Sequence, residues 1–412
     1  MREIALLKNT IQPYGWGSTT SISKLLGVPN PDGQPQAELW MGAHPKAPSQ
    51  VRVGDVWISL DLLIERDPEA ILGLKVAAEF NRRLPFLFKV LAAAAPLSIQ
   101  AHPNREQARE GFERENRQGL PLDAPQRNYR DPNSKPECIC AVTPFWVMCG
   151  FRRPETILTG LRRLSPRALA AEIGDFAAQC DATGLRRLFA ALLALNSGRR
   201  RQAVDEALLN AARWSDEASA WIAPLASHYP ADIGVLAPAL MNVIRLEPGQ
   251  AVSLAAGVLH SYLEGTGIEI MANSDNVVRG GLTSKPVDIP ELINLLKFDR
   301  QDIEMVRSHS VTLTEKIYQT PAREFSLSMI ELRRAEAFQS GDARNVEILL
   351  CIDGHAQIRD MASEKNVLEF PKGTSALVPA SAPVYCITGP ARIFKATVPD
   401  PVSLLDKTKR FK

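Results

Sequence analysis

The sequence has no excess of charge of one sign. Its 412 residues include 48 Lys and Arg and 46 Asp and Glu, which gives a formal net charge of +2. Proteins that bind nucleic acid through their overall electric field carry a basic surplus. The basic residues are dispersed apart from Arg199, Arg200 and Arg201, and we expect these three to lie with Gly198 in a solvated loop between two helices. The charge pattern therefore gives little support for a nucleic-acid partner.

Long apolar runs are also missing. A membrane helix needs about 18 consecutive apolar residues, and no such stretch occurs. The first residues, MREIALLKNTIQPYGWGS, contain neither the apolar core nor the small-residue cleavage site of a signal peptide. We therefore expect a cytoplasmic protein with no membrane partner. The content of 45% hydrophobic and 23% charged residues is that of a globular protein, and 412 residues suffice for two or three structural units.

Cysteines are few, and they do not follow a metal-binding pattern. Their spacing fits no zinc ribbon. Cys138 and Cys140 alternate within ECICAV, which predicts a strand with both thiols on one face. We expect all the cysteines to be free, buried thiols, as in proteins of a reducing compartment. The full set is Cys138, Cys140, Cys149, Cys180, Cys351 and Cys386.

Residues 1–153 and 236–300 have the composition of strands. The runs LPFLFKVL (residues 84–91) and ECICAVTPFWVMCGF (residues 137–151) are apolar and rich in β-branched and aromatic residues. Runs of this kind, bounded by Gly and Pro, are typical of buried strands. We expect the two segments to form one catalytic β domain.

Residues 154–235 differ from what precedes them, because Ala, Leu, Arg and Glu dominate there. Apolar residues recur at helical spacing in LRRLFAALLAL (residues 185–195) and AVDEALLNAARW (residues 203–214). The sequence therefore predicts a helical insert domain of about five short helices.

Residues 301–412 are predicted to form a C-terminal, cupin-like β domain. Short strand-forming runs alternate there with Gly and Pro turns at intervals of roughly 8–12 residues, which favours a sandwich or small barrel. Residues 246–262 and 368–385 also share a form, in which strands alternate with a Pro/Gly turn and a small-residue turn. The later segment has Ser381 and Ala382 where the earlier one leads to His260, so only the earlier one is expected to hold a metal.

Four possible metal ligands lie in the first β part. Gln100 and His102 are two residues apart in LSIQAHPN, so a strand would place both on one face. Glu137 lies in SKPE and His260 in GVLHSYLEG. If they meet, one amide oxygen, two imidazoles and one carboxylate suit zinc, with water or substrate completing the shell. A histidine in a β core is more often structural, and Lys135 and Glu137 at this spacing equally suit a surface ion pair.

A second group of charged residues lies in GIEIMANSDNVVRGGLTSK. Glu269 is in strand-forming sequence, Arg279 precedes Gly280–Gly281, and Lys285 follows. A cation beside two glycines fits the close approach of an anionic ligand. An ordinary turn explains the same residues when they are taken alone.

These motifs together resemble type I mannose-6-phosphate isomerases (phosphomannose isomerases), which are zinc enzymes of the cupin superfamily. The matching stretches follow the family's order through the N-terminal half and the middle, and PKGTSALVPA resembles its C-terminal domain. The stretches are YGWGS, AELWMGAHPKAPS, PFLFKVLAAAAPLSIQAHPN, YRDPNSKPE, GVLHSYLEG and GIEIMANSDNVVRGGLTSK.

The resemblance implies a mainly β fold, with two cupin-type jelly-roll units and an inserted α-helical domain. It also implies an activity in carbohydrate metabolism, the interconversion of mannose 6-phosphate and fructose 6-phosphate, which would serve mannose catabolism or GDP-mannose synthesis. A cis-enediol route would need one base to move the C2 proton and a positive environment for the developing charge. The expected partner is a small sugar phosphate, and the expected state is a monomer.

The resemblance also implies roles for individual residues. Arg279 is expected to be the active-site arginine, and Glu269 the candidate proton shuttle. One Zn2+ per chain would be bound by Gln100, His102, Glu137 and His260. The positions expected near the sugar phosphate are Lys89, Ser98, Lys135 and Lys285. One departure is that the family often has His before the Lys of NHKPE, whereas this chain has Ser134.

Two other functions stay open on the sequence. A metal-dependent dioxygenase or sugar epimerase of the cupin type would also use two histidines and a carboxylate. A regulator that binds sugar phosphate without turnover would need the same cations. Metal analysis, an oxygen-uptake assay and a coupled isomerase assay separate these possibilities.

Overall fold

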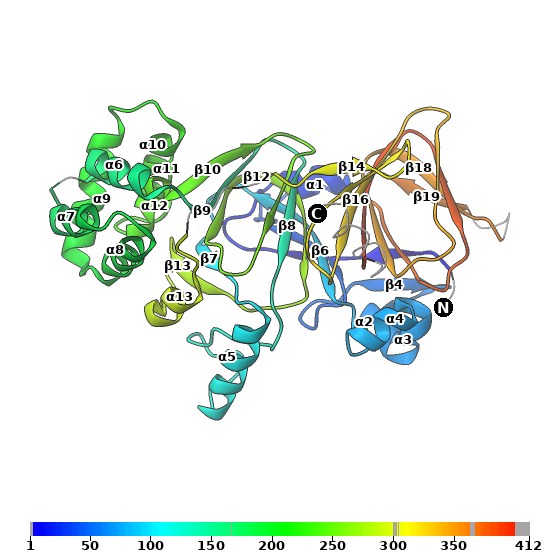
Figure 1. Cartoon of the computed structure of the whole chain (residues 1–412). Helices are drawn as coiled ribbons and strands as arrows, with labels where there is room; N and C mark the ends of the chain where they lie inside the picture. Colours follow the sequence, from blue (N-terminus) through cyan, green and yellow to red (C-terminus); the bar gives the residue numbers. More distant parts are fainter. Residues whose placement is uncertain (1–2, 166, 300–302, 304, 363–366, 400–412) are drawn as a thin grey trace, which may run out of the picture.

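Strands make up most of both ends of the chain, and helices make up its middle (Figure 1). The computed structural model describes residues 3–165, 167–299, 303, 305–362 and 367–399. The predicted mainly β chain with a helical insert is confirmed. Among the residues described, no helix is both long and apolar enough to cross a membrane.

The strands fall into three groups along the chain. The first comprises β1 (Ala5–Lys8), β2 (Thr10–Gln12), β3 (Glu38–Gly42), β4 (Gln50–Val53), β5 (Val56–Ser59), β6 (Phe86–Ala93), β7 (Ile99–Ala101), β8 (Glu137–Ala141) and β9 (Phe145–Phe151). After the insert come β10 (Met241–Leu246), β11 (Ala251–Leu254), β12 (His260–Ala272) and β13 (Val278–Gly281). The C-terminal group comprises β14 (Ser308–Ser310), β15 (Glu315–Tyr318), β16 (Ser326–Leu332), β17 (Ala337–Gln339), β18 (Glu347–Asp360), β19 (Val367–Pro371), β20 (Ser375–Val378), β21 (Tyr385–Thr388) and β22 (Ala391–Thr397).

The helices lie mainly in the insert. Those outside it are α1 (Ser21–Leu26), α2 (Leu60–Arg66), α3 (Pro68–Leu72), α4 (Leu74–Glu79), α5 (Arg105–Arg117) and α13 (Ile289–Leu295). The insert contains α6 (Pro154–Leu164), α7 (Ala170–Ala178), α8 (Ala182–Ala194), α9 (Ser197–Ala211), α10 (Glu217–Ala220) and α11 (Ile222–His228). The 3-10 helix η1 (Ile233–Leu236) and α12 (Ala237–Leu240) then lead back into β10. The described residues of the segment 154–235 thus hold six α-helices, where about five were expected.

The predicted loop at residues 198–201 is wrong, because these residues lie in the first turns of α9. The Asn196 side chain accepts a hydrogen bond from the Arg199 backbone N–H at 3.0 Å and so caps a helix that starts at Ser197. The Arg199 guanidinium then contacts both carboxylate oxygens of Glu172 on α7, at 2.7 and 2.8 Å. The cap and the ion pair compensate for a glycine within the first turn.

The first β part is organised around the long strand β12. Its beginning pairs with β9, and its second half pairs with β6 and β8. The strand changes partners at Gly265, where φ is 128° and an added Cβ would come within 2.6 Å of the Pro144 carbonyl oxygen. Only glycine fits at this bend. Because of the bend, one strand contributes residues to two neighbouring sets of strands.

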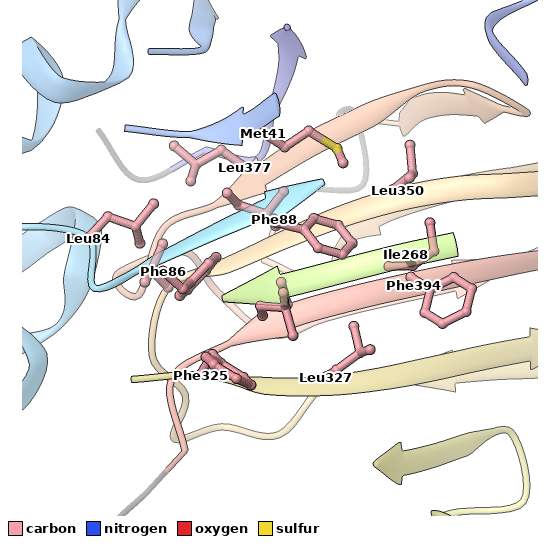
Figure 2. Packing of buried hydrophobic residues seen from close by; sticks show 14 of the residues in the cluster. Met41, Leu84, Phe86, Phe88, Ile268, Phe325, Leu327, Leu350, Leu377 and Phe394 are labelled. Carbon is pink, nitrogen blue, oxygen red and sulfur yellow. The ribbon is translucent and has the colours of Figure 1, made fainter. Parts of the chain in front are cut away.

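The N-terminal strands also reach the C-terminal part. β1 pairs with β20 on one side and with β4 on the other, so β1, β4 and β5 extend the sheet that contains β16, β22 and β18. A large core lies between that sheet and the strands β3, β6 and β12 (Figure 2). Phe86 and Phe88 from β6 and Ile268 from β12 pack there with Phe394 and Leu327 of the C-terminal part.

The cysteines are free, as predicted, and four of them are buried. Cys138 and Cys140 lie on β8 with their side chains in the large core, which confirms the predicted strand and shared face. Cys180 and Cys386 are partly exposed. For these two the prediction of burial was wrong, because Cys180 follows a helix end and Cys386 lies on the short strand β21.

Candidate active site

Three of the four proposed ligands meet inside the first β part. His102 follows β7, Glu137 begins β8 and His260 begins β12. The Nε2 atoms of His102 and His260 lie 3.2 and 3.3 Å from the two carboxylate oxygens of Glu137. All three side chains are at most 2% exposed. Among the described residues, they form the one group of three or more His, Cys, Asp or Glu side chains that could hold a metal ion.

The hydrogen bonds of the two imidazoles determine which nitrogen faces the centre. Nδ1 of His102 lies 2.8 Å from the Asn276 carbonyl oxygen, and Nδ1 of His260 lies 3.0 Å from that of Val258. A carbonyl oxygen only accepts, so each Nδ1 carries the proton and each Nε2 presents a lone pair. Burial, together with the nearby charge of Lys135, lowers the pKa of His102 to about 4. The imidazole is therefore neutral at pH 7, as a metal ligand must be.

Within the described residues, the atoms that face the centre have no hydrogen-bond partner. They are Nε2 of His102, Nε2 of His260 and Oε2 of Glu137, all buried. With both Nδ1 atoms protonated, the short contacts at Glu137 place lone pairs against lone pairs and form no hydrogen bond. Buried polar atoms without a partner are costly. Three such atoms around one point fit a bound cation, so the residues present suit a metal.

Gln100 joins this group through the register of the sheet. It lies at the middle of β7, where its Cα is opposite that of His260 on β12 and that of Arg279 on β13. Directly opposed residues of antiparallel strands project to the same face. The sheet therefore presents an amide, an imidazole and a guanidinium side by side on one face.

Lys135 and Glu137 form an ion pair, but it is buried and not at the surface. Nζ of Lys135 lies 3.1 Å from Oε1 of Glu137, and the residues are 8% and 2% exposed. Although burial opposes ionisation, the ammonium of Lys135 holds the pKa of Glu137 well below its usual range. Glu137 therefore presents a negative charge to the centre.

Glu269 is the centre of a second buried network. Its two oxygens contact Nζ of Lys89 at 3.0 Å and the hydroxyl of Tyr262, which donates to it at 2.9 Å. Lys89 also lies 3.5 Å from Glu38, whose carboxylate accepts the indole N–H of Trp40. Burial raises the pKa of Glu269 despite the opposing charge of Lys89. Lys89, expected near the sugar phosphate, thus has its ammonium group between two carboxylates.

Several positive residues gather around Arg279, which lies opposite Gln100 in the sheet. Burial, with Arg130 close by, lowers the pKa of the partly buried Arg279. The pKa of the exposed Lys285 is lowered by Arg279 first, then by partial burial, Arg130 and Lys46. Two of these cations, Arg130 and Lys46, were not identified from the sequence. Both lie within stretches that carry the family resemblance, YRDPNSKPE and AELWMGAHPKAPS, which was the available signal.

Ser98 and Ser134 are both partly buried in loops of this region. Ser98 lies directly before β7, and Ser134 precedes Lys135 in the loop that leads to β8. The sequence reasoning also gave no role to Glu38, Trp40 and Asn276. All three lie within stretches that carry the family resemblance, but their contacts with Lys89 and His102 join residues distant in sequence.

Comparison with known proteins identifies the family. The phosphomannose isomerase type I catalytic domain matches residues 4–154. The chain is 40% identical to mannose-6-phosphate isomerase of Escherichia coli (strain K12) over 392 residues, which are 94% of this chain and 97% of that protein. This chain belongs to the mannose-6-phosphate isomerase family. It is also 35% identical to mannose-6-phosphate isomerase of Homo sapiens over 364 residues, covering 79% of this chain and 81% of the human protein.

Solved structures of the mannose-6-phosphate isomerase family share this fold. A mutant of phosphomannose isomerase from Salmonella typhimurium superposes with a TM-score of 0.91 at 37% identity, covering 96% of this chain and 99% of that chain. Zinc-bound mannose 6-phosphate isomerase superposes with a TM-score of 0.90, at the same identity and coverage. The family resemblance and the cupin-type β architecture expected from the sequence are therefore confirmed.

Proposed function

We propose that this chain is a zinc-dependent mannose-6-phosphate isomerase that interconverts mannose 6-phosphate and fructose 6-phosphate. The observation that carries the proposal is the group of unpartnered, buried atoms of His102, Glu137 and His260, with Arg279 opposite Gln100 in the same sheet and Lys285 near Arg279. The centre suits a metal, and the cations suit a phosphorylated sugar. The names of the family members supply the specific substrates.

The proposed ligands of one Zn2+ per chain are Gln100, His102, Glu137 and His260. When bound, zinc supplies a Lewis acid for the oxygens of the sugar. The chain supplies two imidazoles whose Nδ1 atoms contact main-chain carbonyls, and an ionised carboxylate between them, before the ion binds. None of these four side chains is a thiolate. The ligands therefore donate less electron density to the ion than those of a cysteine-rich site, and the ion stays a stronger Lewis acid.

The other residues are proposed to act on the sugar phosphate. Arg279 provides a fixed positive charge near O1 and O2, where charge develops in a cis-enediol route. Lys285, with Ser98 and Lys135, would hold the phosphate end and so position the reacting carbons. Glu269 is proposed to carry the proton between C2 and C1, because burial raises its pKa towards that of a general base. In this scheme, Lys89 acts on the sugar phosphate through Glu269, whose charge it compensates.

The domain division is part of the proposal. Residues 1–153 with 236–300 would form the catalytic cupin domain, residues 154–235 a helical insert domain, and residues 301–412 a C-terminal cupin-like domain. The buried apolar residues shared by α6, α8, α9 and α11 support the second of these, and the same cluster continues onto β7, β9 and β13 of the first part. The pairing of β1 with β20 joins the first and third. We further propose that the protein acts as a cytoplasmic monomer, without nucleic-acid or membrane partners.

The direct test is a mannose 6-phosphate isomerase assay on the purified chain, before and after removal of metal with a chelator. We expect turnover with about one zinc per chain, loss of turnover on chelation, and recovery when zinc is added back. Binding of mannose 6-phosphate without turnover would instead identify a regulator. Iron content with oxygen uptake would identify an oxygenase.

A further inference from the structure

Asn276 connects the metal centre to a loop distant in sequence. The residue lies between β12 and β13 and is fully buried. Its backbone carbonyl accepts the Nδ1–H hydrogen bond of His102 at 2.8 Å. Its side chain meanwhile binds only main-chain and side-chain atoms of the loop 130–133, which precedes Lys135 and Glu137. Asn276 thus contacts His102, which is one proposed metal ligand, and the loop that leads to Glu137, which is another.

The side chain of Asn276 uses both ends of its amide. Oδ1 accepts from the backbone N–H of Arg130 at 2.7 Å and of Asp131 at 3.2 Å. Nδ2 donates to the backbone carbonyls of Asp131 at 2.8 Å and Asn133 at 2.9 Å. A buried amide with its hydrogen-bonding capacity filled in this way holds a loop in one conformation.

Further hydrogen bonds join the same two loops. The Asp131 carboxylate accepts from the Ser274 hydroxyl at 3.1 Å and from the Asp275 backbone N–H at 2.8 Å. Asp275 in turn forms ion pairs with Lys46 at 2.8 Å and with His44 at 3.5 Å, from the loop after β3. Three loops from separate parts of the chain therefore meet at residues 274–276.

We infer that Asn276 is a positioning residue of the zinc site, which holds His102 and the approach to Glu137 in the binding geometry before the metal arrives. Its carbonyl fixes the tautomer of His102, and its side chain fixes the loop from which Lys135 and Glu137 extend. The same bonds hold the backbone of Arg130, whose charge lies near Arg279. The inference rests on the proposed zinc site, and it assigns to Asn276 no contact with the metal or the sugar.

The test compares zinc affinity across variants of Asn276. Asn276→Asp keeps the size and the acceptor but loses both N–H donors, and Asn276→Ala loses the whole amide. Both keep the backbone carbonyl that binds His102. We expect the zinc dissociation constant, measured by chelator competition on the metal-free full-length chain, to rise about 10- to 100-fold. At saturating zinc, kcat should return to within a few-fold of the parent value.

The matched control is Asn273→Ala, three residues away. In the part of the chain that the structure describes, the Asn273 side chain bonds only to the Leu84 carbonyl, at 3.4 Å, and this variant should bind zinc as the parent does. A general loss of stability would lower the melting temperature of the metal-free chain without changing its zinc affinity well below that temperature. A folded Asn276→Asp protein with the parent's zinc affinity would overturn the inference.

A milder variant keeps the test decisive if both Asn276 variants fail to fold. Ser274→Ala removes a hydroxyl that donates to Asp131 and the Asn133 carbonyl and accepts from the Asn276 backbone N–H, and it leaves the side-chain amide of Asn276 in place. We expect a smaller rise in the zinc dissociation constant, and an unchanged constant in that folded protein would also overturn the inference. Failure of the proposed function is a separate result, because it would appear as absent isomerase activity in the zinc-loaded parent.

Discussion

At the scale of single residues, the hydrogen bonds of two histidines and two carboxylates determine what each side chain can bind. Main-chain carbonyls keep the Nδ1 protons of His102 and His260, which turns both lone pairs toward Glu137. The Glu269 carboxylate accepts from the Tyr262 hydroxyl and from Lys89. Two carboxylates in one buried region therefore differ in environment: Glu137 is held ionised, and Glu269 has a raised pKa. The ionised Glu137 therefore suits a metal ligand, and Glu269 suits a group that takes up and returns a proton.

Glu269→Gln tests the assignment of the proton. The substitution keeps the shape, but its one amide oxygen can accept from only one of Tyr262 and Lys89, and the amide cannot take up a proton. We expect kcat to fall about 10²- to 10⁴-fold with the zinc content unchanged. Glu264→Gln is the matched control, because Glu264 lies on the same strand with its side chain exposed, and it should keep full activity. Retained exchange of the C2 hydrogen with solvent in the Glu269 variant would remove Glu269 from this role.

Arg279→Ala tests the fixed positive charge. Arg279 lies opposite Gln100 in the sheet but is not a ligand, so we expect the zinc content to stay the same. Loss of charge stabilisation at the reacting oxygens should lower kcat/KM about 10²- to 10³-fold. Arg109→Ala, on the exposed surface of α5, should leave both quantities unchanged. Loss of zinc from the Arg279 variant would instead indicate a structural role.

At the scale of elements, local patterns in the sequence predicted most of the strands and the helical insert. The alternation of Gln100 and His102 and the strand at Glu137 were recognisable because a strand fixes its own periodicity. The pairing of β1 with β20, across most of the chain, was not, because no local pattern records a partner so distant in sequence. The same applies to Glu38 and Lys89, which meet only because β3 and β6 are neighbours.

The loop contact at Asp275 predicts a pH-dependent contribution to stability. Although burial opposes it, His44 and Lys46 hold the pKa of Asp275 well below its usual value. A depressed pKa in the folded state stabilises the fold above the unfolded pKa of about 3.9, and the stabilisation is lost as pH falls below it. Asp275→Asn should therefore lower the free energy of unfolding at pH 7 by about 1 kcal/mol, since Lys46 is largely exposed.

The pH dependence of that difference is the informative measurement. Urea unfolding of the parent and the Asp275→Asn variant should give curves that differ at pH 7 and converge below about pH 4. Asp55→Asn is the control, because the fully exposed Asp55 lies 3.6 Å from Arg52 at the surface, and it should unfold like the parent at every pH. A difference that stayed constant down to pH 3 would show that the charge of Asp275 contributes nothing.

At the scale of the whole molecule, the two β parts share one core. Phe86, Phe88 and Ile268 come from strands that carry the site, and Phe325 and Phe394 come from the C-terminal part (Figure 2). Lys89 lies between Phe88 and Val90 on β6 and faces away from this core, toward Glu269. The packing that joins the two parts thus also supports the strands that position the proposed catalytic residues. The C-terminal part therefore affects the site through this shared packing.

Phe394→Ala therefore should destabilise both parts together. Phe394 is 1% exposed on β22, and removal of its ring leaves a cavity in the shared core. We expect the free energy of unfolding to fall by about 3–5 kcal/mol. Zinc release and the loss of β-sheet signal should follow the same denaturant curve, because the core spans both parts. Val367→Ala, at a partly exposed position on β19, should change the curve little, whereas two separate transitions in the Phe394 variant would show that the site folds independently of the C-terminal part.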